Sequence, residues 1–128
     1  MRPVTVLKDE LLKQIKINRA EHRTIFEEAL DGYRVLAIKT LNRHIRELKS
    51  GKPKRTSVYI PYPEDHTADY DAVIGMLEMS LNSEVELDEQ SYRQLVVNEW
   101  AWTRQFLTTN AVYSATASRL SPKDDEEE

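Results

Sequence analysis

The amino-acid sequence predicts an α+β protein that is mostly helical, with one long N-terminal helix, two shorter helices and a minor sheet of two or three strands. The first observation behind this prediction is that apolar residues recur every three or four positions from about residue 8 to residue 49, as they do on one face of a helix. The second is that a similar periodicity returns after residue 67 and again after residue 88. The third is that three short segments have the alternating or β-branched composition of strands.

The first two predicted elements are a short strand and the long helix. Val4-Thr5-Val6 alternates apolar and polar residues, and the helix that follows contains no proline, with Gly32 as its only weak point. A helix of about 42 residues is roughly 63 Å long, whereas a compact chain of this size is roughly 36 Å across. We therefore expect the helix to project and to be stabilised by self-association. The alternative is a break near Asp31-Gly32 that folds the segment into a hairpin.

The segment after the long helix predicts a helix end, a strand and a second helix start. Gly51 and Pro53 are typical of positions just beyond a helix C-terminus. Residues 56–62 are rich in β-branched and aromatic side chains and predict a strand, which the proline near its end confines to a sheet edge or ends. Asp65 and Thr67 are both favourable N-cap residues. The sequence therefore predicts that one of them caps the second helix.

The second helix carries one apolar stripe, which predicts its buried face. The stripe consists of Tyr70, Val73, Ile74 and Leu77. Met76 and Met79 lie beside the stripe and are expected to fill gaps in the core. Asp69 and Asp71 place negative charge in the first turns, where the helix dipole favours it.

A third short strand and a last helix complete the predicted fold. Residues 83–88 alternate apolar and polar side chains, and Asp88 is expected to cap a helix that extends to about residue 120. Because successive helix positions differ by about 100°, the rings of Trp100 and Trp102 are expected to face different surroundings. The spacing from Phe106 places Trp102 in the core. Trp100 is then predicted to lie at an interface with another copy or a partner, since tryptophan is enriched at binding hot spots.

Composition indicates one domain, over residues 1–121, made of the long helix at about 8–49 and a compact α/β part at about 56–120. The acidic residues 122–128 are predicted to be a disordered tail. Residues 1–56 hold 14 Lys/Arg and 7 Asp/Glu, and residues 57–128 hold 4 and 15, so the two halves carry +7 and −11. Such opposite charges favour association of copies with each other.

There is no cysteine, which excludes disulfides and thiolate zinc sites and suits a reducing cytoplasm. No apolar run predicts a membrane span.

Three groups of residues invite a catalytic or metal-binding interpretation, and each has a structural one. The first group is Glu64, Asp65, His66, Asp69 and Asp71. It has the chemistry of a metal site or a carboxylate–histidine pair, but helix capping explains the acids more simply.

Glu99 on an apolar face has the character of a general acid, or of a structural carboxylate. His22 on the apolar stripe of the long helix is expected to be a core or interface residue. No nucleophile triad or phosphate loop is present in the sequence. We therefore expect a non-enzyme without catalytic residues, metal or cofactor.

One strong basic patch follows the middle of the long helix. It consists of Lys39, Arg43, His44, Arg46, Lys49, Lys52, Lys54 and Arg55. Contact with another protein or with the acidic half of a second copy is the favoured interpretation. A small anionic ligand is an alternative, held by Lys39, Arg43, Arg46 or Arg55 and stacked on Tyr59 or Tyr62. Nucleic acid is less expected because the chain as a whole is acidic.

The segment Pro63-Glu-Asp-His-Thr-Ala-Asp-Tyr-Asp-Ala-Val-Ile-Gly-Met-Leu-Glu-Met-Ser80 resembles the central motif of a family of small tailed-bacteriophage proteins. The resemblance continues in residues 19–33, in Val85-Glu-Leu, in Asn98-Glu-Trp-Ala-Trp102 with Phe106, and in Asn110-Ala-Val-Tyr113, so it covers most of residues 5–117. It implies a phage origin. The family carries no assigned activity, and no catalytic residue is carried over from it.

These observations together predict a non-catalytic phage protein made in the cytoplasm of the infected bacterial host. It is expected to take part in host takeover by binding a host or anti-phage defence factor, as a homo-oligomer built on the long helix and without membrane attachment. One alternative is an oligomer that sequesters an anionic nucleotide signal. Another is a minor virion or assembly component.

Overall fold

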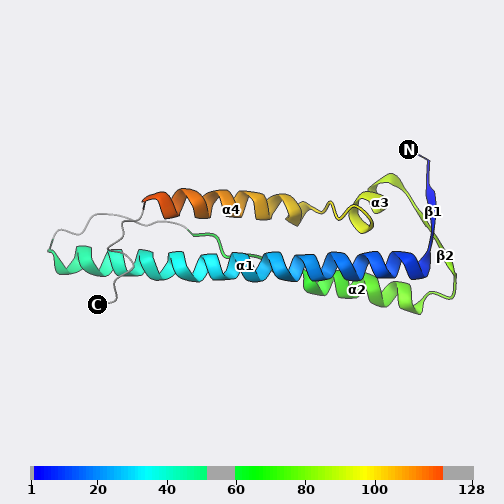
Figure 1. The fold of residues 1–128 in the computed structure, drawn as a ribbon, viewed down its shortest axis with the longest axis horizontal. Coiled ribbons are helices and arrows are strands. Elements are labelled where there is room, and N and C mark those ends of the chain that lie inside the picture. Colours follow the sequence, from blue (N-terminus) through cyan, green and yellow to red (C-terminus); the bar gives the residue numbers. More distant parts are fainter. Residues whose placement is uncertain (1, 52–59, 120–128) are drawn as a thin grey trace. The chain divides into compact units, whose positions relative to one another are not determined.

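The computed structural model describes residues 2–51 and 60–119. The elements follow in the order β1 (Val4–Leu7), α1 (Lys8–Lys49), α2 (Thr67–Met79), β2 (Glu84–Leu87), α3 (Glu89–Leu95) and α4 (Ala101–Arg119) (Figure 1). The predicted fold class is confirmed: the protein is mostly helical, has one long helix near its N-terminus and contains a small sheet. The predicted acidic tail at 122–128 lies outside the described residues.

The chain forms two compact units. The first unit consists of Met1–Phe26 and Glu64–Gln105, and the second of the described parts of Glu27–Pro63 and Phe106–Glu128. Helix α1 contributes its first turns to one unit and its later turns to the other, and it is continuous over 42 residues. The expected long helix is therefore confirmed, and the alternative hairpin near Gly32 does not form.

The sheet of the first unit consists of β1 and β2, which pair antiparallel. Val4 lies opposite Leu87, and Val6 opposite Val85. Since side chains alternate across a strand, these two apolar pairs share one face, and Leu87 is buried there at 3 % exposure. Of the strand predicted at residues 56–62, residues 60–62 have no regular secondary structure, and residues 56–59 lie outside the described part of the chain.

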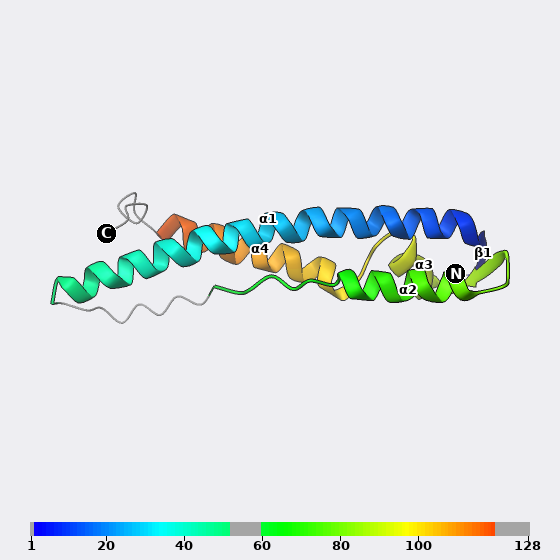
Figure 2. The same cartoon turned by 90° about the horizontal axis from the view of Figure 1, so that it is seen from below.

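The core of the first unit forms where α2 runs alongside the first turns of α1, as both ribbon views show (Figures 1 and 2). Leu11 and Ile15 of α1 are 2 % and 1 % exposed and pack with Tyr70 of α2 and Leu87 of β2. The rest of the predicted stripe of α2 packs against this cluster as partly buried residues, namely Val73, Ile74 and Leu77. Burial of this stripe is what fixes α2 to α1.

The second unit brings the later turns of α1 to α4. Ala29 and Leu36 of α1 and Phe106 and Tyr113 of α4 are buried. A Cβ added at Gly32 would lie 3.4 Å from Cδ2 of Tyr113, so the glycine lets the tyrosine ring lie directly on the helix backbone. The Tyr113 hydroxyl donates a hydrogen bond of 2.6 Å to the carbonyl oxygen of residue 61. Gly32 therefore serves packing and does not break α1.

The last predicted helix is two helices in the structure, so the described part of the chain has three shorter helices where two were expected. Helix α3 ends at Leu95 and α4 begins at Ala101. Between them Asn98 has a φ of 64°, in the left-handed region that asparagine tolerates better than most residues. Its side-chain oxygen accepts a hydrogen bond of 2.7 Å from the Tyr70 hydroxyl. This bond to a residue far away in sequence holds the break in place.

The helix starts partly differ from the predicted caps. Asp88 is the N-cap of α3 and accepts a hydrogen bond of 2.7 Å from the backbone N–H of Ser91, as predicted. This bond lowers the pKa of the Asp88 carboxyl. The N-cap of α2, however, is His66, without a capping side-chain bond. Asp65 lies one residue earlier and accepts from the backbone N–H of Thr67 at 2.9 Å. The N-cap position is therefore His66 and neither predicted residue, although the Asp65 side chain does satisfy the first backbone N–H of α2.

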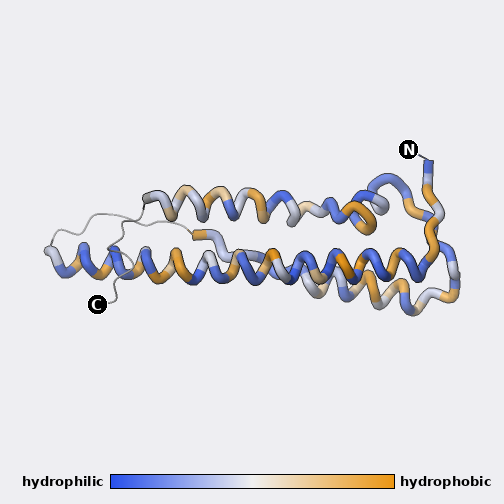
Figure 3. The backbone as a smooth tube through the Cα atoms, in the orientation of Figure 1, coloured by the Kyte–Doolittle hydropathy of each residue, from blue (hydrophilic) through white to orange (hydrophobic). Residues whose placement is uncertain are grey.

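The hydropathy of the helices varies along their length. Apolar and polar residues alternate turn by turn along α1, as orange and blue in Figure 3. Among the described residues, no helix is both long enough and apolar enough to cross a membrane.

Candidate functional site

A stack of three rings lies at the junction of α2 and α4 in the first unit. The ring centroids of His66 and Trp102 are 4.4 Å apart, and those of Trp102 and Trp100 are also 4.4 Å apart, with interplanar angles of 13° and 10°. Tyr70 meets both indoles edge-on, at 6.2 Å from Trp100 and 5.7 Å from Trp102. The indole N–H of Trp102 donates to the Tyr70 hydroxyl at 3.2 Å. Aromatic contacts in these geometries add stability beyond the area that they bury.

The prediction that the two tryptophan rings face different surroundings is wrong. Trp100 precedes the first residue of α4, so the helical increment of about 100° per residue does not apply between it and Trp102. Both rings stack on each other and pack against the core cluster of the first unit. The role of Trp100 at an interface stays a prediction.

His66 is held between two carboxylates. Its Nδ1 lies 3.1 Å from an oxygen of Asp69, and its Nε2 lies 3.1 Å from an oxygen of Glu64. The acids of this segment also bind α1: Asp71 pairs with Arg19 at 2.7 Å, and Asp65 pairs with Arg23 at 2.8 Å. Within residues 2–51 and 60–119, no three His, Asp or Glu side chains gather as metal ligands. The two ion pairs join the start of α2 to α1.

His22 of α1 lies next to Asp65 and His66 and is buried, at 3 % exposure, as the sequence predicts. Its Nε2 accepts a hydrogen bond of 2.8 Å from the backbone N–H of His66. Because a backbone N–H only donates, Nε2 carries no proton, and the neutral ring holds its proton on Nδ1. Burial lowers the pKa of His22. Asp65, whose Oδ1 lies 3.5 Å from Nε2 of His22, raises this pKa, but by less than burial lowers it.

The lowered pKa of His22 makes the stability of the protein depend on pH. The unfolded chain takes up a proton at His22 as the pH falls through about 6.5, whereas the folded chain does so only at lower pH. We therefore expect the urea midpoint of unfolding to fall between about pH 7.5 and pH 5.5. His22→Gln should flatten this dependence, and His44→Gln, at an exposed position of α1, should leave it as in the wild type. An equally steep dependence in His22→Gln would contradict the assignment.

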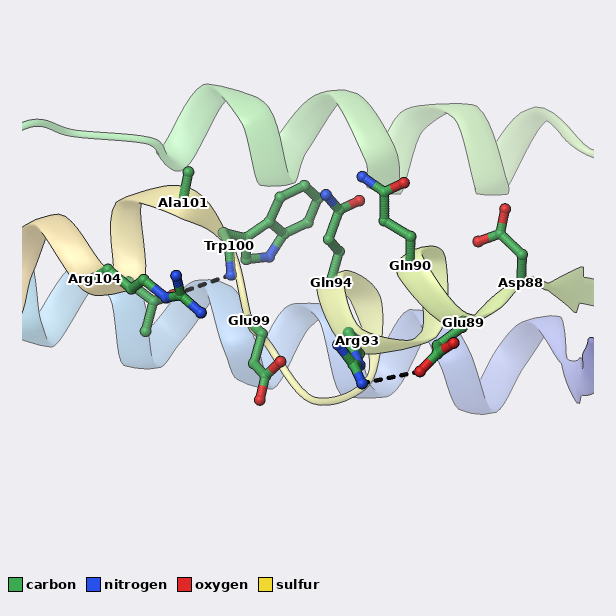
Figure 4. A pocket seen from close by; sticks show the side chains of 10 residues that line it. Asp88, Glu89, Gln90, Arg93, Gln94, Glu99, Trp100, Ala101 and Arg104 are labelled. Atoms are coloured by element: carbon green, nitrogen blue, oxygen red, sulfur yellow. Dashed lines mark hydrogen bonds and ion pairs between the residues drawn. The ribbon is translucent and has the colours of Figure 1, made fainter. Parts of the chain in front are cut away.

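An open groove lies beside Trp100, between α3 and the start of α4. Its lining residues include Glu89 and Arg93, which form an ion pair of 2.9 Å, as well as Glu99 and Arg104 (Figure 4). The indole Nε1 of Trp100 is buried without a hydrogen-bond partner. Glu99 is exposed in this groove, so its predicted place on an apolar helix face is wrong. The reason is that Glu99 lies in the segment between α3 and α4.

The predicted anion-binding residues fall in two parts of the chain. Lys39, Arg43 and Arg46 lie at spacings of four and three on α1 and therefore share one face. Arg43 also pairs with Glu47 at 3.4 Å. Arg55 and Tyr59 lie outside the described residues, together with Lys52 and Lys54. Tyr62 is 60 % exposed and meets the Tyr33 ring edge-on at 5.0 Å.

Large apolar side chains on the later turns of α1 remain exposed, a feature that sequence reasoning missed. We call them the α1 stripe: Val35, Ile38, Leu41, Ile45 and Leu48, which are 41–61 % exposed. Their spacing of three and four residues places them on one face, turned away from the buried Leu36. This spacing was the signal in the sequence, but a periodic pattern does not tell which apolar residues the chain itself covers.

A second apolar face remains exposed on α2, in the first unit. We call it the α2 outer face: Ala68, Ala72, Gly75, Met76 and Met79. Met76 and Met79 are 74 % and 85 % exposed. The expectation that these methionines fill the core was therefore wrong, because the core side of α2 is already occupied by Tyr70 and its stripe.

In comparisons with protein-family models, with curated proteins and with solved structures, none matches this chain.

Proposed function

We propose that this protein acts by binding other proteins, without catalysis of its own, and that it does so as a homo-oligomer. The observation that carries this proposal is the α1 stripe, with five apolar side chains that the described part of the chain leaves uncovered on one helix face. Contiguous apolar surface of this kind marks a site of protein association in proteins that are otherwise well packed. The same uncovered stripe supports the expectation that the long helix is stabilised by self-association.

The partner that we propose is a host or anti-phage defence factor in the infected bacterial cytoplasm. The resemblance of residues 63–80 to the central motif of tailed-phage proteins supports the infected bacterium as the place where the protein acts. A different face of α1, which holds the cations Lys39, Arg43 and Arg46, supports a partner of opposite charge. Charge at such a contact supplies selectivity.

The partner is tested by capture from infected cells. A tagged chain expressed during infection is expected to retain one or more host or defence proteins, and the same bait carrying Leu41→Asp and Ile45→Asp should lose them, because this double substitution disrupts the oligomer that the partner is proposed to bind. Recovery of the protein only inside mature phage particles would contradict the proposal and point to a virion component.

Self-association is tested by the same double substitution on purified protein. Leu41→Asp with Ile45→Asp is expected to raise the dissociation constant of the oligomer by about a hundredfold or more, since each buried side chain of this size contributes about 1.5–3 kcal/mol. Both positions are exposed in the protomer, so the circular dichroism spectrum should keep its helical signal. Ile25→Asp is the matched control, since Ile25 is 42 % exposed on α1 but outside the α1 stripe. An unchanged dissociation constant in the double variant would contradict the role of the stripe.

A further inference from the structure

Helix α2 is apolar on two opposite sides. One side holds Tyr70, Val73, Ile74 and Leu77, which face the core of the first unit. The other is the α2 outer face, where a Cβ added at Gly75 would meet no atom within 4 Å. Acidic residues lie between the two sides. An exposed apolar surface bordered by polar residues marks a site of protein association, and the described part of the protomer leaves the two methionines of the α2 outer face exposed.

We propose that the α2 outer face of one copy packs antiparallel against the α1 stripe of a second copy. This inference rests on the proposed self-association and names the two surfaces that meet. The occupant of the α2 outer face is then a second copy of this chain, and the α1 stripe is covered by the same contact.

The two surfaces match in length and in spacing. Helix α2 has 13 residues, or about 20 Å at 1.5 Å per residue, and the α1 stripe extends over a similar length from Val35 to Leu48. In the antiparallel direction, Ala68 faces Leu48, and Met79 faces Ile38. The small residues of α2 form a shallow surface into which the branched side chains of the stripe fit, as ridges fit into grooves.

Charge favours this pairing over a pairing of like surfaces. Residues 67–79 carry three acids and no cation, a formal charge of −3. Residues 35–49 carry four cations and one acid, a formal charge of +3 with His44 neutral. Two α1 stripes facing each other would bring together two positive helices, and two α2 outer faces would bring together two negative ones. Opposite charges at a contact favour the correct partner surface and disfavour the wrong ones.

The direction of the pairing follows from where the charges lie along each helix. Two acids of α2, Asp69 and Asp71, are in its first turns, and two cations of α1, Arg46 and Lys49, are in its last turn. An antiparallel arrangement brings these ends together and also opposes the two helix dipoles. Within the protomer, Asp71 already pairs with Arg19 and Glu78 with Lys16, at exposed positions. Exposed pairs of this kind contribute little energy by themselves.

Disulfide trapping tests the contact cleanly because the chain has no cysteine. Ala68→Cys protein is mixed with Leu48→Cys protein under mild oxidation. The mixture is expected to form a covalent dimer that contains one chain of each variant, because two cysteines bridge only when their Cα atoms lie within about 7 Å. Glu28→Cys, at an exposed position of α1, is the matched control and should not couple to Ala68→Cys. Circular dichroism of each variant checks that the fold is retained.

Four results would overturn the inference. Coupling of Ala68→Cys to Ile38→Cys in place of Leu48→Cys would mean a parallel contact. Rapid coupling of Leu48→Cys with itself would mean that α1 stripes meet each other. An oligomer in sedimentation without Ala68–Leu48 coupling would overturn the contact and leave self-association standing, whereas a monomer in sedimentation would remove the proposed homo-oligomer as well.

Discussion

Replacing Trp102 with alanine is expected to destabilise the protein by about 3 kcal/mol, toward the lower end for truncation of a large aromatic side chain because the residue is only half-buried. The indole lies between the rings of His66 and Trp100 at 4.4 Å from each, so its removal leaves both without their stacking partner. It also removes the N–H that donates to the Tyr70 hydroxyl. Urea unfolding followed by circular dichroism measures the change.

Phenylalanine substitutions separate the ring from its hydrogen bond. Trp102→Phe keeps an aromatic ring but loses the bond to Tyr70, so it should be less stable than the wild type. Trp100→Phe removes a buried N–H that has no partner, so it should be neutral or stabilising, within about 1 kcal/mol. A larger loss in Trp100→Phe than in Trp102→Phe would contradict the arrangement of the stack.

Ile15→Ala is expected to destabilise the protein by about 2–5 kcal/mol, the range for truncation of a buried aliphatic side chain. Ile15 is 1 % exposed and lies in the core cluster with Leu11, Tyr70 and Leu87. Residues from α1, α2 and β2 thus meet around it, and the cavity that alanine leaves would loosen all three elements. The change in the free energy of unfolding is measured from the shift of the urea midpoint, provided that the dependence of this free energy on urea concentration is unchanged.

Ile17→Ala is the matched control for this substitution. Ile17 lies two residues further along the same helix but is 53 % exposed. Its replacement should change the free energy of unfolding by about 0.5 kcal/mol or less, as at most surface positions. Equal losses at the two positions would mean that α1 does not present Ile15 to the core.

Much of the fold was predictable because local signals and packing agree. The apolar periodicity of residues 8–49 is continuous, and the structure has one helix there. The alternation around Val85 marks β2, and Asp88 caps α3 through its own side chain. The stripe of α2 that begins at Tyr70 faces the core. In each case, the residues that decide the element lie within a few positions of it.

The break between α3 and α4 was not predictable from local pattern, because apolar spacing continues across it. It depends on Asn98, whose left-handed backbone is held by a hydrogen bond from Tyr70. The error about Glu99 and the rings of Trp100 and Trp102 follows from this break, since all three were placed on one continuous helix. A contact between residues 28 positions apart in the sequence carries no local signal.

The candidate binding surfaces were predictable only in part. The cations Lys39, Arg43 and Arg46 were identified, and the structure places them on one face of α1. The apolar residues of the α1 stripe were visible as a helical periodicity, but periodicity alone does not separate covered from uncovered faces. Met76 and Met79 illustrate this, since they lie on an apolar helix and yet are exposed.

Sedimentation equilibrium of the purified chain, over a wide range of protein concentration, tests the central claim most directly. A protein that works through the α1 stripe as a homo-oligomer should sediment with at least twice the monomer mass at micromolar concentration, and dissociate only on dilution. A monomer mass at every concentration, with the helical circular dichroism signal intact, would contradict the account.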